Sequence, residues 1–296
     1  WSVWPSVHAT GRGSAEVSVC LIAVMPVGPF LRATGTVEGM VPPSGADSHP
    51  FLTHPGVLAF AHRGGTGDWP ENTMAAFAHA VDLGFTYLET DVHLTADGIV
   101  VAFHDSSLDR VSDSVGLISG LSWDEVSQAR VGGTEGVPRL SDLFEAFPAA
   151  RVNIDPKDDA VVDALVEVIR DHDALARVCI GAFSDRRIER CRDLLGAGLC
   201  TSAGPGATAR FRLANFGIPF SAPPWRCLQV PVRSRGVRIV DRRFVEHAHR
   251  MALQVHVWTV DDPDEMHALL DLGVDGLMTD RPAVLRDVLF ERDQWA

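Results

Sequence analysis

Apolar runs alternate with segments of helical periodicity from residue 57 almost to the C-terminus, and this alternation restricts the possible folds more than any other feature. The apolar runs begin near residues 57, 86, 152, 178, 199, 227, 255 and 274. Segments with an apolar stripe at helical spacing cover residues 71–83, 160–171, 185–195, 207–214, 242–251, 263–270 and 282–290. Strands that alternate with helices in this way form parallel sheets. Eight such repeats predict an α/β fold, a closed (β/α)₈ barrel.

The main alternative is an open, doubly wound sheet, which the same alternation permits. Charged residues follow several different apolar runs, whereas a doubly wound sheet gathers its site mainly at one switch point. One further apolar run, 99–103, follows the turn 96–98 and is interpreted as the outer strand of a hairpin. The barrel is therefore the predicted fold.

Two segments fall outside the repeat. Residues 106–143 separate the second and third barrel strands and contain a short capped helix at 121–126. An insertion of this size usually lies over the mouth of a barrel. Residues 1–50 are rich in Gly, Pro, Ser, Val and Thr and lack a helical period, so we interpret them as a disordered leader, with Met40 as the native start. Residues 51–296 form the predicted barrel domain.

Composition excludes several classes of protein. The formal net charge is -13, whereas a nucleic-acid-binding protein normally carries the opposite sign. No apolar run reaches the roughly 18 residues of a membrane span, and prolines interrupt the one candidate secretory signal, so we expect a cytoplasmic protein without membrane insertion. The five cysteines contain no CxxC pair, which predicts buried thiols rather than a disulfide framework or a zinc site. The oligomeric state stays open.

Carboxylates are placed where two consecutive barrel strands end. Glu89 and Asp91 are two residues apart, so their side chains face the same side of a strand. Asp155 and Lys157 repeat this arrangement on the next strand. Carboxylates left alone together repel and raise each other's pKa, and a divalent cation relieves the repulsion. The pattern predicts a site for such a cation, with Lys157 free to bind a phosphate oxygen as a point charge.

Two histidines bracket these carboxylates in the sequence. His62 ends the first run beside Arg63, and His104 ends the hairpin beside Asp105. Because the ordinary pKa of imidazole is near neutrality, one histidine can accept a proton while the other donates one. Acid/base groups, an anion-binding group and oxygen ligands together are what metal-assisted phosphoester chemistry needs. The predicted substrate is an anionic small molecule.

Other residues near these motifs have both structural and functional interpretations. His93 shares the face of Asp91 and is interpreted as a packed strand histidine, with a place near the site as the alternative. Residues 71–73 are interpreted as a helix cap, and residues 279–282 as structural. Trp258 ends the seventh strand and is either part of the core or an apolar wall for the alcohol part of a substrate.

The chain resembles the glycerophosphodiester phosphodiesterase family over about residues 51–289. The matching segments are His62-Arg63-Gly64, Pro70-Glu71-Asn72-Thr73, Glu89-Thr90-Asp91-Val92, Leu94-Thr95-Ala96-Asp97-Gly98, His104-Asp105, Asn153-Ile154-Asp155-Pro156-Lys157, Val257-Trp258-Thr259-Val260 and residues 275–282. The segment 106–143 also resembles the insertion that distinguishes this family among related phospholipase barrels.

The resemblance implies a (β/α)₈ barrel that hydrolyses glycerophosphodiesters to glycerol 3-phosphate and an alcohol. It implies His62 and His104 as the acid/base pair, with Arg63 and Lys157 on the phosphate. It also implies Ca²⁺ or Mg²⁺ held by three carboxylates, those of Glu89, Asp91 and Asp155.

One departure concerns the ligand set, because the family often has Glu where Asp155 stands. Asp is one methylene shorter, so the ion would shift, take a bridging water or be a different ion.

Other functions remain as alternatives. A lysophospholipase D or a sphingomyelinase-like phospholipase would have the same architecture but needs an apolar mouth. A catalytically silent barrel that binds phosphodiesters or a protein partner is a third interpretation. The presence of both His62 and His104 argues against it, since a protein that only binds does not need two imidazoles.

Overall fold

The computed structural model describes residues 49–215, 218 and 220–296. Parallel strands in the order β8-β7-β6-β2-β1-β13-β12-β9 form the central sheet of this part of the chain. A bridge between Ser202 and Cys227 brings the two ends of the sheet together, with the Ala203 N–H donating to the Cys227 carbonyl over 3.0 Å. The strands are β1 (Leu58–Ala61), β2 (Tyr87–Leu94), β6 (Arg151–Pro156), β7 (Val178–Ile180), β8 (Cys200–Thr201), β9 (Cys227–Pro231), β12 (Gln254–Trp258) and β13 (Gly276–Thr279).

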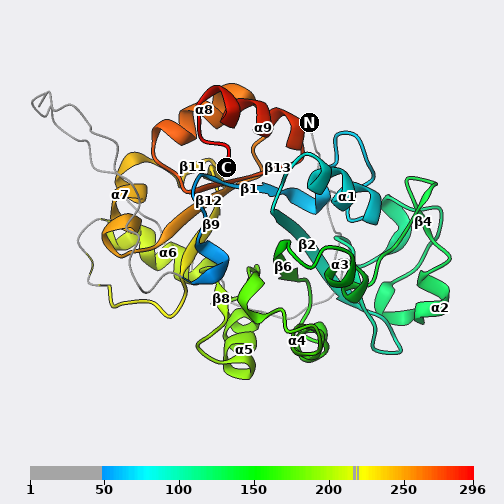
Figure 1. Ribbon diagram of the computed structural model, residues 1–296. Helices are drawn as coiled ribbons and strands as arrows, with labels where there is room; N and C mark the ends of the chain where they lie inside the picture. Colours follow the sequence, from blue (N-terminus) through cyan, green and yellow to red (C-terminus); the bar gives the residue numbers. More distant parts are fainter. Residues whose placement is uncertain (1–48, 216–217, 219) are drawn as a thin grey trace, which may run out of the picture. The chain divides into compact units, whose positions relative to one another are not determined.

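Helices surround this barrel, as Figure 1 shows, with α9 beside β1, α7 beside β12 and α4 beside β2 and β6. Their apolar faces pack on the outward side chains of the strands, and this layer holds the largest group of buried apolar residues. The helices are α1 (Met74–Asp82), α3 (Leu140–Ala146), α4 (Val161–Asp171), α5 (Asp185–Leu195), α6 (Pro205–Ala214), α7 (Arg242–Arg250), α8 (Pro263–Asp271) and α9 (Pro282–Glu291). The predicted (β/α)₈ barrel and the positions of its eight strands are confirmed.

The interior of the barrel is filled by alternate residues of its strands, because successive side chains of a strand point to opposite faces. Phe60, Tyr87 and Met278 pack together there. The interior also contains polar side chains, since Gln229 donates to the Asn153 side chain over 2.7 Å. Because of this two-residue period, the inward face of each strand continues to its carboxyl end, where the site lies.

A short 3₁₀ segment, η1 (Pro50–Leu52), packs against the opposite end of the barrel interior. The Tyr87 hydroxyl donates to the Phe51 carbonyl over 2.7 Å, and the Gln254 amide donates to the Leu52 carbonyl over 3.1 Å. The His49 ring contacts the Gly198 carbonyl at 2.8 Å. Residues 49 and 50, which the sequence assigned to the leader, therefore belong to the barrel. The rest of the predicted leader, with Met40, lies outside the described residues.

The segment between β2 and β6 forms a small layer with its own apolar cluster, which contains Phe103, Leu108, Ile118 and Val126. Its hairpin strand β3 (Val100–Ala102) pairs antiparallel with β2, as predicted. Helix α2 (Trp123–Val126) has the predicted cap, since Ser122 and Glu125 form a capping box. The segment also contains η3 (Leu108–Arg110), η4 (Ile118–Gly120), β4 (Arg130–Val131) and β5 (Glu135–Gly136). Helix α3 follows at Leu140 and joins the barrel core instead.

Helix α1 begins later than its apolar period indicates. The sequence placed the start at residue 71, but the first helical residue is Met74, capped by Thr73. Asn72 has a positive φ of 54° and so breaks the helical path. Its side chain donates to Asp91 over 3.3 Å and accepts from Thr90 over 2.8 Å, contacts that replace a further helical turn.

Two smaller features complete the described part of the chain. Strands β10 (Arg233–Ser234) and β11 (Val237–Arg238) form an exposed hairpin after β9, and η5 (Leu175–Arg177) precedes β7. Among the described residues, the helices are too short or too polar to span a bilayer.

We expect the ion pair between His249 and Asp275 to make stability depend on pH. His249 Nε2 lies 2.9 Å from Asp275 Oδ2. The same carboxylate accepts from the Val255 N–H over 2.7 Å, and it therefore joins α7 to β12. The hydrogen bond with Asp275 raises the pKa of His249 above its ordinary value. Its contribution, roughly 1 kcal/mol because the ring is partly exposed, is full below about pH 6.5 and is lost as pH rises through the raised pKa.

Urea unfolding of the wild type and His249→Gln at pH 5.5 and 8.5 tests this expectation. The difference in free energy of unfolding between the two proteins should be larger at pH 5.5. An equal difference at both values contradicts the assignment.

Candidate active site

Charged side chains from several strands converge at the carboxyl end of the barrel. Glu89 and Asp91 lie on β2, Asp155 on β6, and His62 directly follows β1. The three carboxylates are only 5%, 2% and 7% exposed, in the order in which they occur in the chain. Burying ionised carboxylates is costly unless cations or hydrogen bonds compensate them, so their partners define the site.

Lys157 is the compensating cation for two of these carboxylates. Its Nζ lies 2.6 Å from Asp91 Oδ1 and 2.7 Å from Asp155 Oδ2. Burial lowers the pKa of Lys157, but the two carboxylates outweigh burial and raise it, so the ammonium is charged. Lys157 is the only lysine in a chain whose other basic side chains are arginines and histidines. A compact ammonium fits between two carboxylate oxygens where the planar fork of Arg would not.

Arg63 connects Glu89 to Asp91. Its backbone N–H donates to Glu89 Oε2 over 3.0 Å, and its Nε lies 3.2 Å from Asp91 Oδ2 in an ionic contact. Its Nη1 donates to Glu71 Oε1 over 3.1 Å. The chain turns sharply here, with positive φ at Arg63 and at Gly64. A Cβ at Gly64 would lie 2.8 Å from the Ala76 Cβ, so this close approach of the turn to α1 requires glycine.

His62 is oriented by a carboxylate from the last barrel strand. Its Nδ1–H donates to Asp280 Oδ1 over 2.7 Å, which leaves Nε2 3.8 Å from Glu89 Oε2. Burial lowers the pKa of His62, but Glu89 and Asp280 outweigh burial and raise it above the ordinary value.

His104 has the same arrangement on the other side of the site. Its Nδ1–H donates to Asp105 Oδ1 over 2.6 Å, and the His93 ring holds the His104 carbonyl at 3.1 Å. Arg110 donates to Asp105 and Glu71. Hydrogen bonds from Arg110 lower the pKa of Asp105 to about 2, so this partner stays ionised. Burial lowers the pKa of His104. The two imidazoles are thus biased toward opposite protonation states near neutrality.

Glu89 and Asp155 have raised pKa values, and one Asp155 oxygen has no partner in the described part of the chain. Burial, assisted by Asp91, raises the pKa of Glu89 to about 7, and burial raises that of Asp155 to about 6. Asp155 Oδ1 is buried without a hydrogen-bond partner. Carboxylate oxygens, one of them unpaired, are the kind of donor that a hard cation such as Ca²⁺ or Mg²⁺ prefers. Within the described residues the three carboxylates do not bring one oxygen each within 4.8 Å of the others.

An aromatic wall borders the charged cluster. Trp258, half-buried at the end of β12, packs edge-on against Phe183 with ring centroids 5.5 Å apart. The Phe183 ring also lies 5.8 Å from Lys157 Nζ and is 65% exposed. Phe183 thus lies between Trp258 and Lys157, and Trp258 also packs against the apolar residues of the barrel interior.

The structure brings together the histidines and charged residues named from the sequence, and it adds some that sequence reasoning missed. Asp280 was interpreted as structural but orients His62, and its signal was its position two residues after the inward-facing Met278. Glu71 does not cap α1 but joins Arg63 to Arg110. Phe183 had no sequence signal beyond its place after β7.

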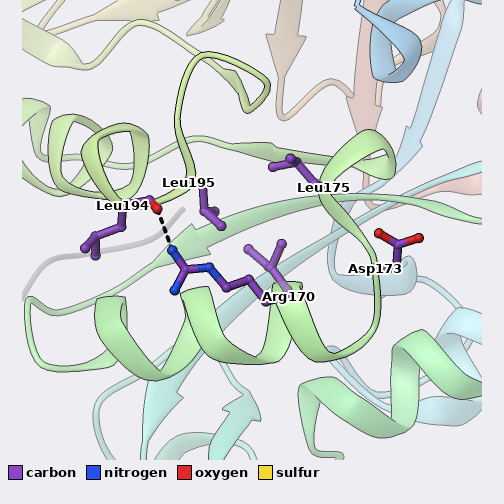
Figure 2. A pocket seen from close by; sticks show the side chains of 6 residues that line it. Arg170, Asp173, Leu175, Leu194 and Leu195 are labelled. Atoms are coloured by element: carbon purple, nitrogen blue, oxygen red, sulfur yellow. Dashed lines mark hydrogen bonds between the residues drawn. The ribbon is translucent and has the colours of Figure 1, made fainter.

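A hollow elsewhere in the described residues has a different character. It measures about 210 Å³ and lies between the C-terminal ends of α4 and α5. Figure 2 shows Arg170 reaching across it to the Leu194 carbonyl, over 2.6 Å, with leucines beside it. Helix C-termini lie at the amino end of barrel strands, so this hollow is at the opposite end from the charged cluster.

Comparison with known proteins shows the family of the chain. The model of the glycerophosphoryl diester phosphodiesterase family matches residues 62–284, a range that contains both His62 and Asp280. The chain belongs to this family. It is 43% identical over 258 residues to the probable glycerophosphodiester phosphodiesterase 2 of Mycobacterium tuberculosis, covering 85% of this chain and 97% of that protein. It is also 31% identical over 268 residues to a human lysophospholipase D, covering 77% and 85%. The chain is thus a phosphoric diester hydrolase.

Solved structures have the same fold. A phosphodiesterase of Oleispira antarctica in complex with the product sn-glycerol-3-phosphate matches with a TM-score of 0.67 and 25% identity, covering 79% of this chain and 97% of that one. The glycerophosphodiester phosphodiesterase of Agrobacterium tumefaciens matches with a TM-score of 0.65 and 22% identity, covering 78% and 99%, and this match shows the fold alone.

We expect Lys157→Arg to lower kcat/KM by about 100-fold, because the larger guanidinium cannot occupy the place between Asp91 and Asp155 and still face a substrate phosphate. Steady-state hydrolysis of a glycerophosphodiester measures the effect. Arg170→Lys, a cation exchange in the remote hollow, is the control and should retain wild-type turnover. Turnover of Lys157→Arg within a factor of three of wild type would show that charge alone is sufficient at this position.

Proposed function

We propose that this enzyme hydrolyses glycerophosphodiesters, with a divalent cation, to sn-glycerol 3-phosphate and an alcohol. The observation that carries the proposal is the pair of imidazoles, His62 and His104, each oriented by its own carboxylate on either side of a buried carboxylate cluster. The names of the relatives and the product complex of the Oleispira antarctica protein support the same reaction.

Arg63 and Lys157 bind the phosphate group in this proposal. Both carry their charge next to Asp91, so the site is locally balanced although the whole chain has a formal net charge of -13. When substrate binds, the Lys157 ammonium turns from the carboxylates toward a phosphoryl oxygen. There it neutralises the negative charge that builds up as the bond to the leaving alcohol breaks.

Glu89, Asp91 and Asp155 hold the cation. A bound Ca²⁺ or Mg²⁺ polarises the phosphate and lowers the pKa of the attacking hydroxyl. The unpaired Asp155 Oδ1 and the raised pKa values of Asp155 and Glu89 support this assignment, because a cation would stabilise both carboxylates in their ionised forms.

His62 and His104 move the protons. One imidazole takes the proton from the nucleophile, which is a glycerol hydroxyl or a water. Attack by water gives glycerol 3-phosphate directly, whereas attack by the hydroxyl gives a cyclic phosphate that a water then opens to glycerol 3-phosphate. The other imidazole donates a proton to the leaving alkoxide, so that no free alkoxide forms. Asp280 and Asp105 hold the Nδ1 atoms, which leaves each Nε2 for proton transfer.

A lysophospholipid is the second candidate substrate, and the aromatic wall favours it. Phe183 is exposed beside Lys157, and Val115 and Leu117 in the segment after His104 are exposed too. These apolar surfaces could cover part of an acyl chain. The human lysophospholipase D is among the relatives that support this reading.

We expect chelation to abolish release of glycerol 3-phosphate from glycerophosphocholine and glycerophosphoethanolamine, and one of Ca²⁺, Mg²⁺ or Mn²⁺ to restore it. The carboxylates cannot supply the missing positive charge themselves. An enzyme-coupled assay of glycerol 3-phosphate measures the release, with lysophosphatidylcholine as a parallel substrate. Restored cleavage of the lysolipid alone favours the second candidate. Full activity after chelation contradicts metal dependence.

Purified His104→Ala should lose at least about 1,000-fold in kcat, because the proton transfer at one end of the reaction loses its catalyst. His172→Ala, which removes an imidazole on a distant loop, is the matched control and should keep wild-type turnover. Circular dichroism shows whether each variant is folded. Near-normal turnover of His104→Ala would remove this residue from the mechanism.

A further inference from the structure

Three cysteines meet inside the barrel, toward the end opposite the catalytic cluster. Cys179, Cys200 and Cys227 come from the neighbouring strands β7, β8 and β9, and all three side chains are fully buried. The sheet register pairs Cys179 with Cys200, and the bridge at Ser202 brings Cys227 alongside them. The three thiols are free, and no disulfide joins them. The spacing of these cysteines in the sequence did not reveal the group, because the strands that carry them come together only when the barrel closes.

The distances between the sulfur atoms suit a metal ion. All three Sγ atoms lie within 4.8 Å of one another, and those of Cys179 and Cys227 are 3.9 Å apart. Zn²⁺ binds thiolates at about 2.3 Å in tetrahedral sites, which places the sulfur atoms about 3.8 Å apart. Small side-chain adjustments would therefore bring the three thiolates around one ion. Soft thiolate donors select Zn²⁺ or Cu⁺ over hard cations such as Ca²⁺ and Mg²⁺.

Polar neighbours of the three thiols support binding of a cation. The Cys227 thiol interacts with the His256 side chain, whose two ring nitrogens also contact the side chains of Gln229 and Gln254. Burial raises the pKa of Cys200, but hydrogen bonds from Cys179 and Cys227 outweigh burial and lower it. Arg226 and Tyr87 are the other titratable groups that act on these thiols.

We propose that Cys179, Cys200 and Cys227 form a structural site for a soft d¹⁰ cation, with Zn²⁺ as the ion. Binding replaces three S–H bonds by three S–Zn bonds and releases three protons to solvent. The site differs from the catalytic cluster in its place in the barrel and in its ligand chemistry, sulfur instead of oxygen. It does not depend on the proposed phosphodiesterase function.

The ion enters before the barrel interior is closed. Phe51 and Leu52 pack against the same apolar group as the three cysteines, and their carbonyls are tied to Tyr87 and Gln254. The experiment therefore loads metal in two ways, by addition to the folded protein and by refolding in its presence.

Co²⁺ is the probe, because thiolate ligands give it a sulfur-to-metal charge-transfer band that carboxylate ligands lack. The full chain, reduced and stripped of metal, is titrated with Co²⁺ alone by both routes. We expect a charge-transfer band that saturates at one equivalent per chain and disappears when one equivalent of Zn²⁺ is added. Absence of the band by both routes overturns the proposal and leaves the thiols as small buried apolar side chains.

Matched variants assign the band to these residues. Cys200→Ala should abolish it, and Cys191→Ala, which removes an equally buried thiol from α5, should retain it. Zn²⁺ present during refolding should raise the Tm of the wild type and of Cys191→Ala but not that of Cys200→Ala. Cys179→Ala replaces Cys200→Ala if that variant does not fold. A band that survives loss of Cys200 and of Cys179 overturns the assignment.

Discussion

The ammonium of Lys157 between Asp91 and Asp155 is the interaction on which the active site depends. Two buried carboxylates on neighbouring strands would repel each other and distort the end of the barrel, and one cation within 2.7 Å of both removes that repulsion. Burial raises the pKa of Asp91, but Lys157 and Arg63 outweigh burial and lower it. The charges at this end of the barrel are in this way balanced within the protein.

Around this centre, several functional groups are held by partners from other parts of the fold. Asp280, directly after β13, orients His62 after β1, and Asn72 before α1 donates to Asp91 on β2. Arg110, in the segment between β2 and β6, connects Asp105 to Glu71. The insertion therefore contributes Arg110 to the network that orients His104 through Asp105. Its own apolar cluster explains how it can hold Arg110 in place without support from the barrel core.

The two ends of the barrel have opposite chemistry for a simple reason. The strands have a two-residue period, so each inward face continues from a packed interior residue to a residue at the carboxyl end. Hard oxygen and nitrogen donors gather where solvent and substrate have access. Soft sulfur donors lie where apolar side chains and η1 exclude both. One barrel thus has two polar groups of different chemistry, oxygen and nitrogen donors at one end and sulfur donors toward the other.

The sequence by itself determined the barrel, its eight strands and most of the site. Hydrophobic periodicity is a local property, and Glu89, Asp91, Asp155 and Lys157 follow from strand ends that the chain itself marks. Only the tertiary structure decided the pairs His62–Asp280 and Glu71–Arg110, the aromatic contact of Trp258 with Phe183, and the group of three cysteines. Each of these joins residues from separate elements, up to 218 positions apart in the chain. Their distances depend on the register and closure of the barrel, which no local pattern encodes.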